Sequence, residues 1–321
     1  MKLIKQSYYI ITEKDTYKLI ELAGRTAYKS EDKITDDSAE KFCQKIFNSK
    51  HWSVLEHSNI IFQINLNIYD AILSTNYNKF LTLTEYNGRY LVSGNIRAWL
   101  DFFDNLQYTA WWSHNRDFCL IYSILSSRYP IFFINQDSYP VIRGDKSCKL
   151  PRTIEFEELS SNERVCHHRI SVRFITPRSL SHEIVRHRTC SFTQESTRYC
   201  TYKTGCTYII PEWTKEIVPG NYSYSQEYNV SNINEFNWFY AMLKLENIYK
   251  DLLTNGLKPQ QARGILPNDL KTEIVVTANL IDWNRFFNLR ISSGAHPQMV
   301  ELVTPLYKEL KQSYPNLIVD L

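Results

Sequence analysis

Residues 169–188 read Arg-Ile-Ser-Val-Arg-Phe-Ile-Thr-Pro-Arg-Ser-Leu-Ser-His-Glu-Ile-Val-Arg-His-Arg. Apolar and polar residues alternate over 169–175, which predicts a strand. Pro177 suits the first turn of a helix, and we expect that helix to run from about 178 to 187. Its C-terminal end would carry the Arg-His-Arg run at 186–188, where the helix dipole favours cations.

The stretch 186–198 concentrates more anion-binding capacity than any other part of the chain. Ser196 and Arg198 follow the Arg-His-Arg run, with further polar residues between them. Arginine presents its donors in a rigid fork that fits phosphates and carboxylates. Three such residues alone would more often form a solvated helix end. The apolar residues before the run and the unbroken polar series after it favour a bound polyanion instead.

The composition is that of a globular protein. The chain has 321 residues, 43% hydrophobic and 22% charged, which allows one large domain or two ordinary ones. A net charge of +3 is too small to indicate binding of a nucleic acid polymer. We expect no membrane span and no signal peptide, because no apolar run is long enough. The seven scattered cysteines favour a reducing cytoplasm.

Hydrophobic periodicity predicts a mixture of strands and helices. We expect strands at 2–12, 60–68 and 169–175, and helices at 14–24, 38–47, 93–104, 178–187, 234–254, 259–263, 270–289 and 295–314. The segment from about 105 to 165 reads as an irregular insertion, and no internal repeat or linker is evident. We therefore predict a single α+β domain over 1–321 with long helices.

Several other polar residues are weaker signals when taken singly. His57 alone is more often a structural residue than a ligand. Cys166-His167-His168 lacks the second spaced pair that a zinc site needs, so we expect no metal. Arg263 lies between a short helix and Pro267, which fixes its direction and suits a ligand contact. Asn279 is explained equally well by a buried hydrogen bond between helices or by a ligand.

Arg-His-Arg at 186–188, seven further residues and then Ser196 form the signature of the flavin-dependent thymidylate synthases (the ThyX family), which this chain resembles. The resemblance extends, in the expected order, over residues 20–100 and 169–300. The segments that carry it are 24–30, 51–57, 93–99, 172–175, 181–188, 191–200, 258–267 and 277–279.

The resemblance implies an activity, a fold and an assembly. A methylene group would pass from methylenetetrahydrofolate to carbon 5 of dUMP, with hydride from FAD that NADPH reduces again. No enzyme nucleophile would add to dUMP, so Ser196 would bind the substrate rather than attack it. The fold would be α+β, with a central antiparallel or mixed sheet and long helices. The family also implies a homotetramer with shared active sites.

The resemblance also implies the site residues. FAD would contact His57, Asn59, Arg186, His187, Arg188, Gln194, Asn279 and Arg285. The dUMP site would comprise Glu183, Arg186, Gln194, Glu195, Ser196, Thr197, Arg198, Arg263 and Arg290. Arg290, at the uracil edge, would be the catalytic residue, because a cation there stabilises charge that develops on the ring. Glu183, Gln194 and Arg285 differ from the residues common in the family, which are Gln, Glu, and His or Asn.

Three alternatives remain. A flavin-free thymidylate synthase needs a cysteine nucleophile in a Pro-Cys-His setting, but Val165 precedes Cys166 here. A nucleic-acid-binding module could use the arginine cluster against phosphates, with a steep salt dependence. A family member could also bind the nucleotide without turnover, which the intact Arg-His-Arg run and Ser196 speak against.

Overall fold

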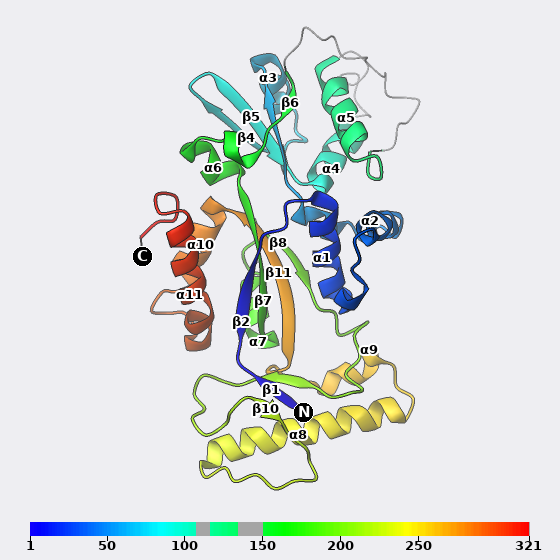
Figure 1. The fold of residues 1–321 in the computed structure, drawn as a ribbon, viewed down its shortest axis with the longest axis vertical. Coiled ribbons are helices and arrows are strands. Elements are labelled where there is room, and N and C mark those ends of the chain that lie inside the picture. Colours follow the sequence, from blue (N-terminus) through cyan, green and yellow to red (C-terminus); the bar gives the residue numbers. More distant parts are fainter. Residues whose placement is uncertain (107–115, 134–149, 321) are drawn as a thin grey trace.

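The computed structural model describes residues 1–106, 116–133 and 150–320. Three sheets follow one another along the long axis of the molecule, and we name them lower, middle and upper after their places in Figure 1. The lower sheet has the order β10 (Gly220–Asn221), β1 (Lys2–Ile4), β9 (Thr207–Ile209). The middle sheet has the order β2 (Ser7–Ile11), β7 (Arg169–Pro177), β11 (Lys271–Asn279), β8 (Ser191–Gln194). The upper sheet has the order β4 (Thr82–Tyr86), β5 (Arg89–Gly94), β3 (Ile60–Ile64), β6 (Arg152–Thr153).

Helices surround these sheets (Figure 1). The middle sheet lies between one helix pair, α1 (Thr16–Tyr28) and α2 (Ser38–Asn48), and a second pair, α10 (Leu280–Arg290) and α11 (Pro297–Ser313). The long helix α8 (Ile233–Thr254) lies against the lower sheet, near the short α9 (Pro259–Ala262). The remaining helices are α3 (Leu66–Ser74), α4 (Ile96–Leu106), α5 (Arg116–Arg128), α6 (Ser161–His167) and α7 (Arg178–Ile184). Short 3-10 turns occur at η1 (Glu31–Lys33), η2 (Trp52–His57), η4 (Phe156–Glu158) and η5 (Arg263–Ile265).

The α+β class is confirmed, but the chain builds three sheets where we expected one central sheet. The expected helix at 270–289 is wrong in its first half, because Lys271–Asn279 forms strand β11 and the helix begins at Leu280. The strand has the β-branched run Ile274-Val275-Val276-Thr277, which favours extended backbone. It is buried on both faces between two neighbouring strands, so the alternation that marks a half-exposed strand is absent.

Other boundaries also differ from expectation. The expected strand at 60–68 ends at Ile64, because the Asn65 side chain accepts from the Ile68 N–H and starts α3. The helix expected to reach 187 ends at Ile184, so the Arg-His-Arg run lies in the turn after it. The insertion expected to be irregular contains α5, β6 and α6. Its parts at 107–115 and 134–149 lie outside the described residues.

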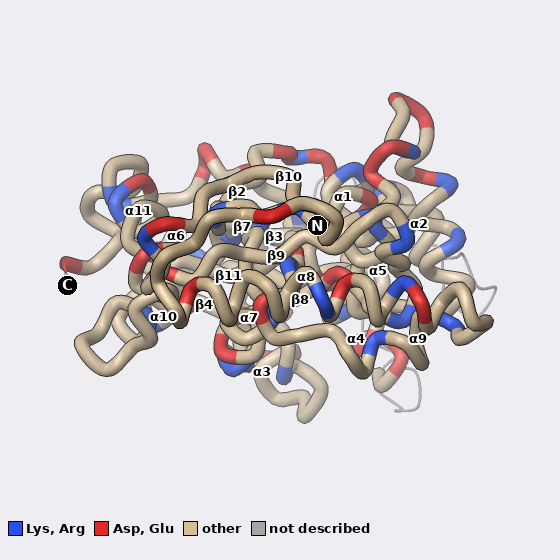
Figure 2. Tube along the Cα trace, turned by 90° about the horizontal axis from the view of Figure 1, so that it is seen from below, with Lys and Arg blue, Asp and Glu red and all other residues tan. Residues whose placement is uncertain are grey.

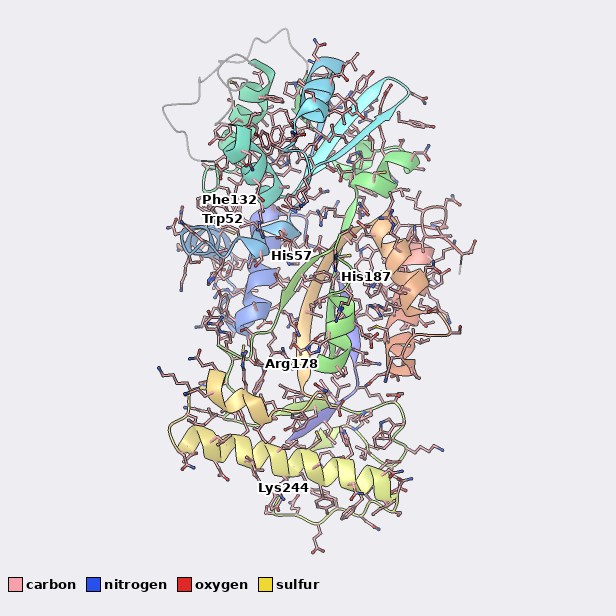
Figure 3. The ribbon with its side chains drawn as sticks, turned by 180° about the vertical axis from the view of Figure 1, so that it is seen from behind. Trp52, His57, Phe132, Arg178, His187 and Lys244 are labelled. Atoms are coloured by element: carbon pink, nitrogen blue, oxygen red, sulfur yellow. The ribbon has the colours of Figure 1, made fainter. Side chains whose placement is uncertain are left out.

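Two buried histidines join the middle sheet to the upper sheet. His57 directly precedes the upper-sheet strand β3, yet its ring nitrogens lie 2.8 Å from the hydroxyls of Thr193 and Thr277 in the middle sheet. His167 directly precedes the middle-sheet strand β7, and its ring nitrogens lie 2.7 Å from the hydroxyls of Thr84 and Ser93 in the upper sheet. Both side chains are fully buried. Figure 3 shows His57 where the two sheets meet.

Charges of both signs are interspersed over the part of the chain that the structure describes. Lysine and arginine alternate with aspartate and glutamate along the chain trace in Figure 2. Among the described residues, no helix combines the length and the apolar character needed to cross a membrane.

The two histidines should make the stability of the protein depend on pH. Burial lowers the pKa of His57 to about 3 and that of His167 to about 4, so both are neutral in the folded protein. Their pKa values lie below the ordinary value of about 6.5, so the stability that they contribute is complete above that pH and is lost as the pH falls towards 4. Each histidine should account for a loss on the order of 3 kcal/mol by about pH 4.

Urea unfolding between pH 4 and 8 measures this loss. His57→Gln and His167→Gln should each be less stable at neutral pH but show a shallower decline on acidification. The exposed His182→Gln variant is the control. An unchanged pH slope in both buried variants would contradict the assignment.

Candidate active site

The Arg-His-Arg run lies in the turn that joins α7 to β8. The N–H groups of residues 186, 187 and 190 donate to the carbonyls of 183, 184 and 187 at 3.2, 3.3 and 3.0 Å, so the turn is closed by its own backbone. Arg186 and Arg188 are exposed, and no carboxylate in the described part of the chain lies within ion-pair distance of either. The turn therefore presents two uncompensated guanidinium groups on a fixed backbone.

His187 faces inwards and is held by α10. Its ring lies 4.7 Å from that of Phe286, and Arg290 donates through Nε to its Nε2 at 3.1 Å. Burial, reinforced by the charge of Arg290, lowers the pKa of His187 to about 4. The imidazole is therefore neutral near pH 7, with Nε2 as the acceptor.

Arg290 ends α10 and is buried against the same turn. Its Nη1 donates to Glu183 Oε2 at 2.9 Å, and its Nη2 donates to the Glu183 carbonyl. Burial lowers the pKa of Arg290, and the Glu183 carboxylate acts in the opposite direction. Arg290, which lies more than 100 residues after the other two in the sequence, therefore forms one cluster with Glu183 and His187 that fixes the guanidinium plane.

The polar residues after β8 have two kinds of environment. The Gln194 amide donates to Ser181 Oγ and Thr272 Oγ1 at 2.9 and 3.1 Å. Glu195 is only 2% exposed, accepts from the Tyr202 hydroxyl at 2.8 Å and pairs with Lys271 at 2.9 Å. Both Glu195 oxygens thus have protein partners, which gives this residue a structural role in the described structure.

The end of the same loop faces outwards. Ser196 is partly exposed, and its Oγ accepts from the Arg198 N–H at 3.3 Å. Arg263 donates through Nη1 to Thr197 Oγ1 at 3.4 Å, which brings the segment 258–267 to this loop. Arg198 and Arg263 are both exposed, so their guanidinium groups can reach an anion from solvent.

Four residues that we expected at the flavin have protein partners of their own. His57 is fully buried with both nitrogens bonded to hydroxyls, so it offers no free nitrogen to a ligand. Asn59 donates to the His167 carbonyl at 2.8 Å. Asn279 caps α10 by accepting from the Asp282 N–H, at the edge of a pocket. Arg285 is exposed and pairs with Asp282 at 3.1 Å.

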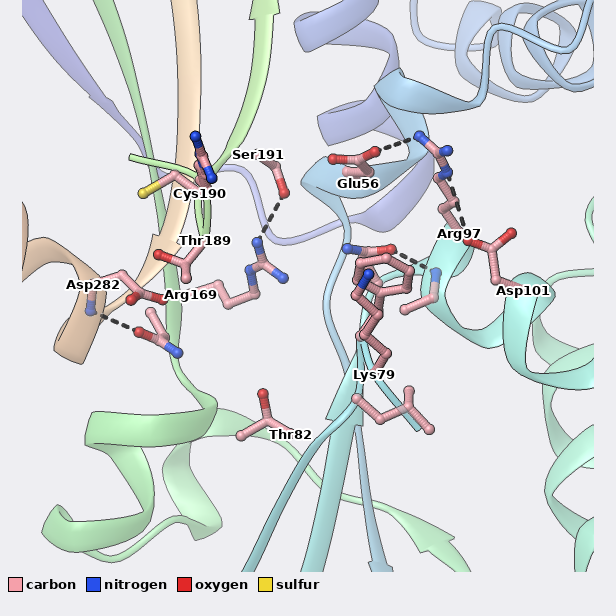
Figure 4. A pocket seen from close by; sticks show the side chains of 16 residues that line it. Glu56, Lys79, Thr82, Arg97, Asp101, Arg169, Thr189, Cys190, Ser191 and Asp282 are labelled. Carbon is pink, nitrogen blue, oxygen red and sulfur yellow. Dashed lines mark hydrogen bonds and ion pairs between the residues drawn. The ribbon is translucent and has the colours of Figure 1, made fainter. Parts of the chain in front are cut away.

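Two pockets flank β8, and we name each after one of its residues. The Arg169 pocket, of about 440 Å³, is lined by Glu56, Lys79, Phe80, Leu81, Thr82, Asn95, Arg97, Ala98, Asp101, Arg169, Arg188, Thr189, Cys190, Ser191, Asn279 and Asp282 (Figure 4). The Ser196 pocket, of about 490 Å³, is lined by Ala27, Tyr28, Lys50, His51, Trp52, Ser53, Val54, Arg97, Phe192, Thr193, Gln194, Ser196 and Tyr199. Arg97 lines both pockets.

The pockets divide the residues predicted for the two ligands. Arg188 and Asn279, predicted for FAD, line the Arg169 pocket. Gln194 and Ser196, predicted for dUMP, line the Ser196 pocket. The other predicted residues lie outside these two walls: His57, Asn59, Glu183, Arg186, His187, Glu195, Thr197, Arg198, Arg263, Arg285 and Arg290.

Sequence reasoning missed several residues of the pocket walls. His51 lines the Ser196 pocket and its Nδ1 lies 2.7 Å from the Tyr28 hydroxyl. It belongs to the segment 51–57, in which His57 is the residue that we expected to contact FAD. Arg169 opens a strand and Arg97 lies in a helix, and both read as ordinary charged residues. In the described residues, no group of three His, Cys, Asp or Glu side chains could hold a metal ion.

A buried ion-pair network supports the loop beneath these pockets. Lys271 lies between Glu195 and Glu273, and Arg173 pairs with Glu273 from the neighbouring strand. Burial opposes the charge of Lys271, but the two carboxylates outweigh it and raise its pKa. The ion pair between Glu195 and Lys271 therefore anchors the loop at 195–198 to β11. Removing one partner alone would leave the other charge buried and unpaired.

Lys271→Met should destabilise the protein by about 3–5 kcal/mol, because it leaves Glu195 buried without its main counter-charge. The double variant Lys271→Met/Glu195→Leu should recover part of that loss. Urea unfolding of both variants tests this. Lys41→Met, which breaks an exposed pair with Asp37, should cost less than about 1 kcal/mol and is the control. Equal losses for Lys271→Met and Lys41→Met would refute the anchoring role.

Comparison with known proteins places the sequence in a family. A family model described as thymidylate synthase complementing protein matches residues 9–70 and 162–316, well over half of the chain. The unmatched stretch 71–161 is longer than the insertion that we expected at 105–165.

Curated relatives match over shorter stretches. A flavin-dependent thymidylate synthase of Pyrococcus furiosus is 31% identical over 136 residues, 41% of this chain and 50% of the relative. Relatives with the same name from Sulfurisphaera tokodaii and Corynebacterium diphtheriae are 35% and 30% identical, over 44% of this chain and 49% and 57% of the relatives. The chain thus spans about half the length of the curated relatives that it matches. On the extent of the family match, this chain belongs to the family of thymidylate synthase complementing proteins.

Proposed function

We propose that this protein is a flavin-dependent thymidylate synthase that methylates dUMP to dTMP, with methylenetetrahydrofolate as carbon donor and NADPH as reductant. One observation carries the proposal. Arg290 from α10 bonds to Glu183 and His187 at the uncompensated Arg-His-Arg turn, and β8 joins this turn to the Ser196 loop, all inside the family match at 162–316.

The residues present fit a flavin dinucleotide. Arg186 and Arg188 are exposed on a fixed turn and face no carboxylate in the described structure, which suits the pyrophosphate of FAD. The Arg169 pocket beside Arg188 offers space for part of the cofactor. When bound, FAD would supply the hydride chemistry, and the protein supplies position and field.

The Ser196 pocket fits dUMP. Tyr28 and Tyr199 give it aromatic walls for a planar base, and Gln194 and Ser196 give it polar groups. Arg198 and Arg263 are exposed nearby, where they could hold the nucleotide phosphate. We assign Arg290 to the uracil edge. Because His187 stays neutral near pH 7, the guanidinium is the charge that would stabilise an anionic ring.

Neither candidate nucleophile is activated. Ser196 Oγ has no hydrogen bond to a His, Asp or Glu side chain in the described structure, so no base is placed to take its proton. Burial raises the pKa of the Cys166 thiol, which disfavours the thiolate that a flavin-free enzyme needs. Both features support a mechanism without an enzyme nucleophile.

We also propose a ThyX-type fold, a homotetramer and a cytoplasmic location. Exposed apolar side chains beside the turn, such as Val185 and Leu289, are available for subunit contacts. The six described cysteines are all free, which suits a reducing compartment.

Three measurements on the purified protein test the function. We expect a flavin absorbance spectrum, bleaching by NADPH that dUMP accelerates, and dTMP detected chromatographically. A protein that cannot be reconstituted with FAD and forms no dTMP would overturn the proposal.

Variants test the roles of individual residues. Ser196→Ala and Cys166→Ala should retain measurable turnover, because neither residue attacks dUMP. Arg290→Lys should reduce kcat by about a hundredfold or more, because the bidentate guanidinium is lost. Complete loss of dTMP formation in Cys166→Ala, with FAD still bound, would instead favour the flavin-free mechanism.

A further inference from the structure

Residues 57–106, which extend from the family match into the unmatched stretch 71–161, form a second version of the unit that carries the candidate site. Residues 92–103 read Val-Ser-Gly-Asn-Ile-Arg-Ala-Trp-Leu-Asp-Phe-Phe, and residues 276–287 read Val-Thr-Ala-Asn-Leu-Ile-Asp-Trp-Asn-Arg-Phe-Phe. The Val, Asn, Trp and both Phe positions coincide. Both stretches run from the end of a strand into a helix, β5 into α4 and β11 into α10. Our expectation that the chain has no internal repeat is therefore wrong.

The sheet topology repeats with the same register. The upper sheet, read as β6-β3-β5-β4, and the middle sheet, read as β2-β7-β11-β8, have four antiparallel strands in corresponding order. Ser93 pairs with Ile61 and Thr82, and Thr277 pairs with Ser171 and Ser191 at the corresponding positions. We name residues 57–106 the first unit, and residues 167–194 together with 271–290 the second unit.

Side-chain geometry follows the same correspondence. Asn95 accepts from the Ala98 N–H at 2.8 Å, as Asn279 accepts from the Asp282 N–H at 2.9 Å. The ring of Trp99 is stacked on that of Phe103 at an interplanar angle of 25°, and the corresponding pair in the second unit also makes 25°. In each unit the remaining two ring pairs of this aromatic triad are T-shaped.

The two units exchange contacts reciprocally. His57 begins the first unit and bonds to Thr193 and Thr277 of the second, whereas His167 begins the second unit and bonds to Thr84 and Ser93 of the first. Ser93 corresponds to Thr277 in the register above. Equal contacts in both directions are the property of a two-fold interface, here within one chain.

The Arg169 pocket lies between the two units and takes one wall from each (Figure 4). Corresponding residues line it in pairs, such as Asn95 with Asn279 and Thr82 with Ser191. The charges do not repeat, however. Arg97 of the first unit corresponds to Ile281 of the second in the aligned sequences. Corresponding residues of the two units therefore form the walls of the cavity, and positions at which the units differ, such as Arg97 and Ile281, determine its charge.

Arg169 is the uncompensated charge of this cavity. One Nη atom donates to Ser191 Oγ at 2.9 Å and to the Thr277 carbonyl at 3.3 Å, while the buried Nε has no partner in the described structure. The carboxylates of Glu56 and Asp282 act on it only from beyond ion-pair distance. A partly buried cation whose Nε is fully buried and has no counter-ion is costly, and an anionic ligand would remove that cost.

The acidic groups that line the cavity already form ion pairs with other residues. Glu56 and Asp101 pair with Arg97 at 2.6 and 3.7 Å, and Asp282 pairs with Arg285 at 3.1 Å. Lys79 and Arg188 have no ion-pair partner among the described residues. Three cations therefore face the cavity without a paired carboxylate, from both of its walls.

We propose that the Arg169 pocket binds the oxyanion of a cofactor, a phosphate or a carboxylate, with Arg169 and Arg188 of the second unit on one wall and Lys79 of the first unit on the other. The identification of the ligand as a cofactor rests on the proposed function, whereas the anion site itself does not. The first unit thus supplies one wall of a site whose other wall belongs to the second unit.

Calorimetric titration with inorganic pyrophosphate and with glutarate tests the site and distinguishes its two possible ligand chemistries. We expect one of the two anions to bind the wild-type protein, and Arg169→Gln to weaken that binding at least tenfold. Arg169→Lys should keep part of the affinity, and Lys79→Gln should weaken it several-fold. Arg128→Gln, which removes an exposed arginine outside the pocket, is the matched control and should bind like the wild type.

The thermal unfolding midpoint of each variant shows whether it is folded. Lys79 is exposed, so Lys79→Gln tests the pocket without disturbing the buried hydrogen bonds of Arg169. Binding of neither anion, or equal binding in the wild type, Arg169→Gln and Lys79→Gln, would overturn the proposal. FAD binding and dTMP formation, measured on the same samples, separate it from the proposed function. If the wild type makes dTMP, and Arg169→Gln binds FAD and both anions as tightly as the wild type does, the anion site is refuted and the proposed function stands. Arg169-dependent anion binding in a protein without flavin or dTMP formation supports the site and refutes the enzyme.

Discussion

The pairing of β7 with β11 is the constraint on which the rest of the site depends. The two strands run antiparallel without a break from Lys271 opposite Pro177 to Asn279 opposite Arg169. At one end of β7 the chain turns into α7 and the Arg-His-Arg run, and at the far end of β11 it enters α10. Because the register is fixed by burial on both faces, the turn and α10 meet, and Arg290 reaches His187 and Glu183.

Burial gives the polar groups of this region different tasks. Arg290, His187 and Glu183 satisfy one another, as do Lys271, Glu195 and Glu273, so these groups orient the structure around the pockets. Arg186 and Arg188 lie on the rim without such partners. The groups that bond to one another therefore support the site, whereas the two exposed arginines without ion-pair partners among the described residues form its ligand-binding surface.

The two related units explain why residues 71–106 of the unmatched stretch are packed against the rest of the molecule. Each unit is completed by a strand from outside itself, β2 beside β7 and β6 beside β3, and each receives a histidine from the other. Neither sheet satisfies its buried hydroxyls alone. The chain therefore contains an interface of two-fold character within itself, and a cavity is left where the units meet.

The sequence by itself determined the α+β class, most helices and the family. The sequence located helices such as Ile233–Thr254, and the Arg-His-Arg spacing identified the family that the comparison then showed. It misread Lys271–Asn279, because a strand buried on both faces has no alternation to detect. Only the tertiary structure decided that His57 is buried between sheets, that Glu195 is paired with Lys271, and that Arg169 faces a cavity. These outcomes depend on long-range partners more than 70 residues away in the chain, and local patterns carry no information about them.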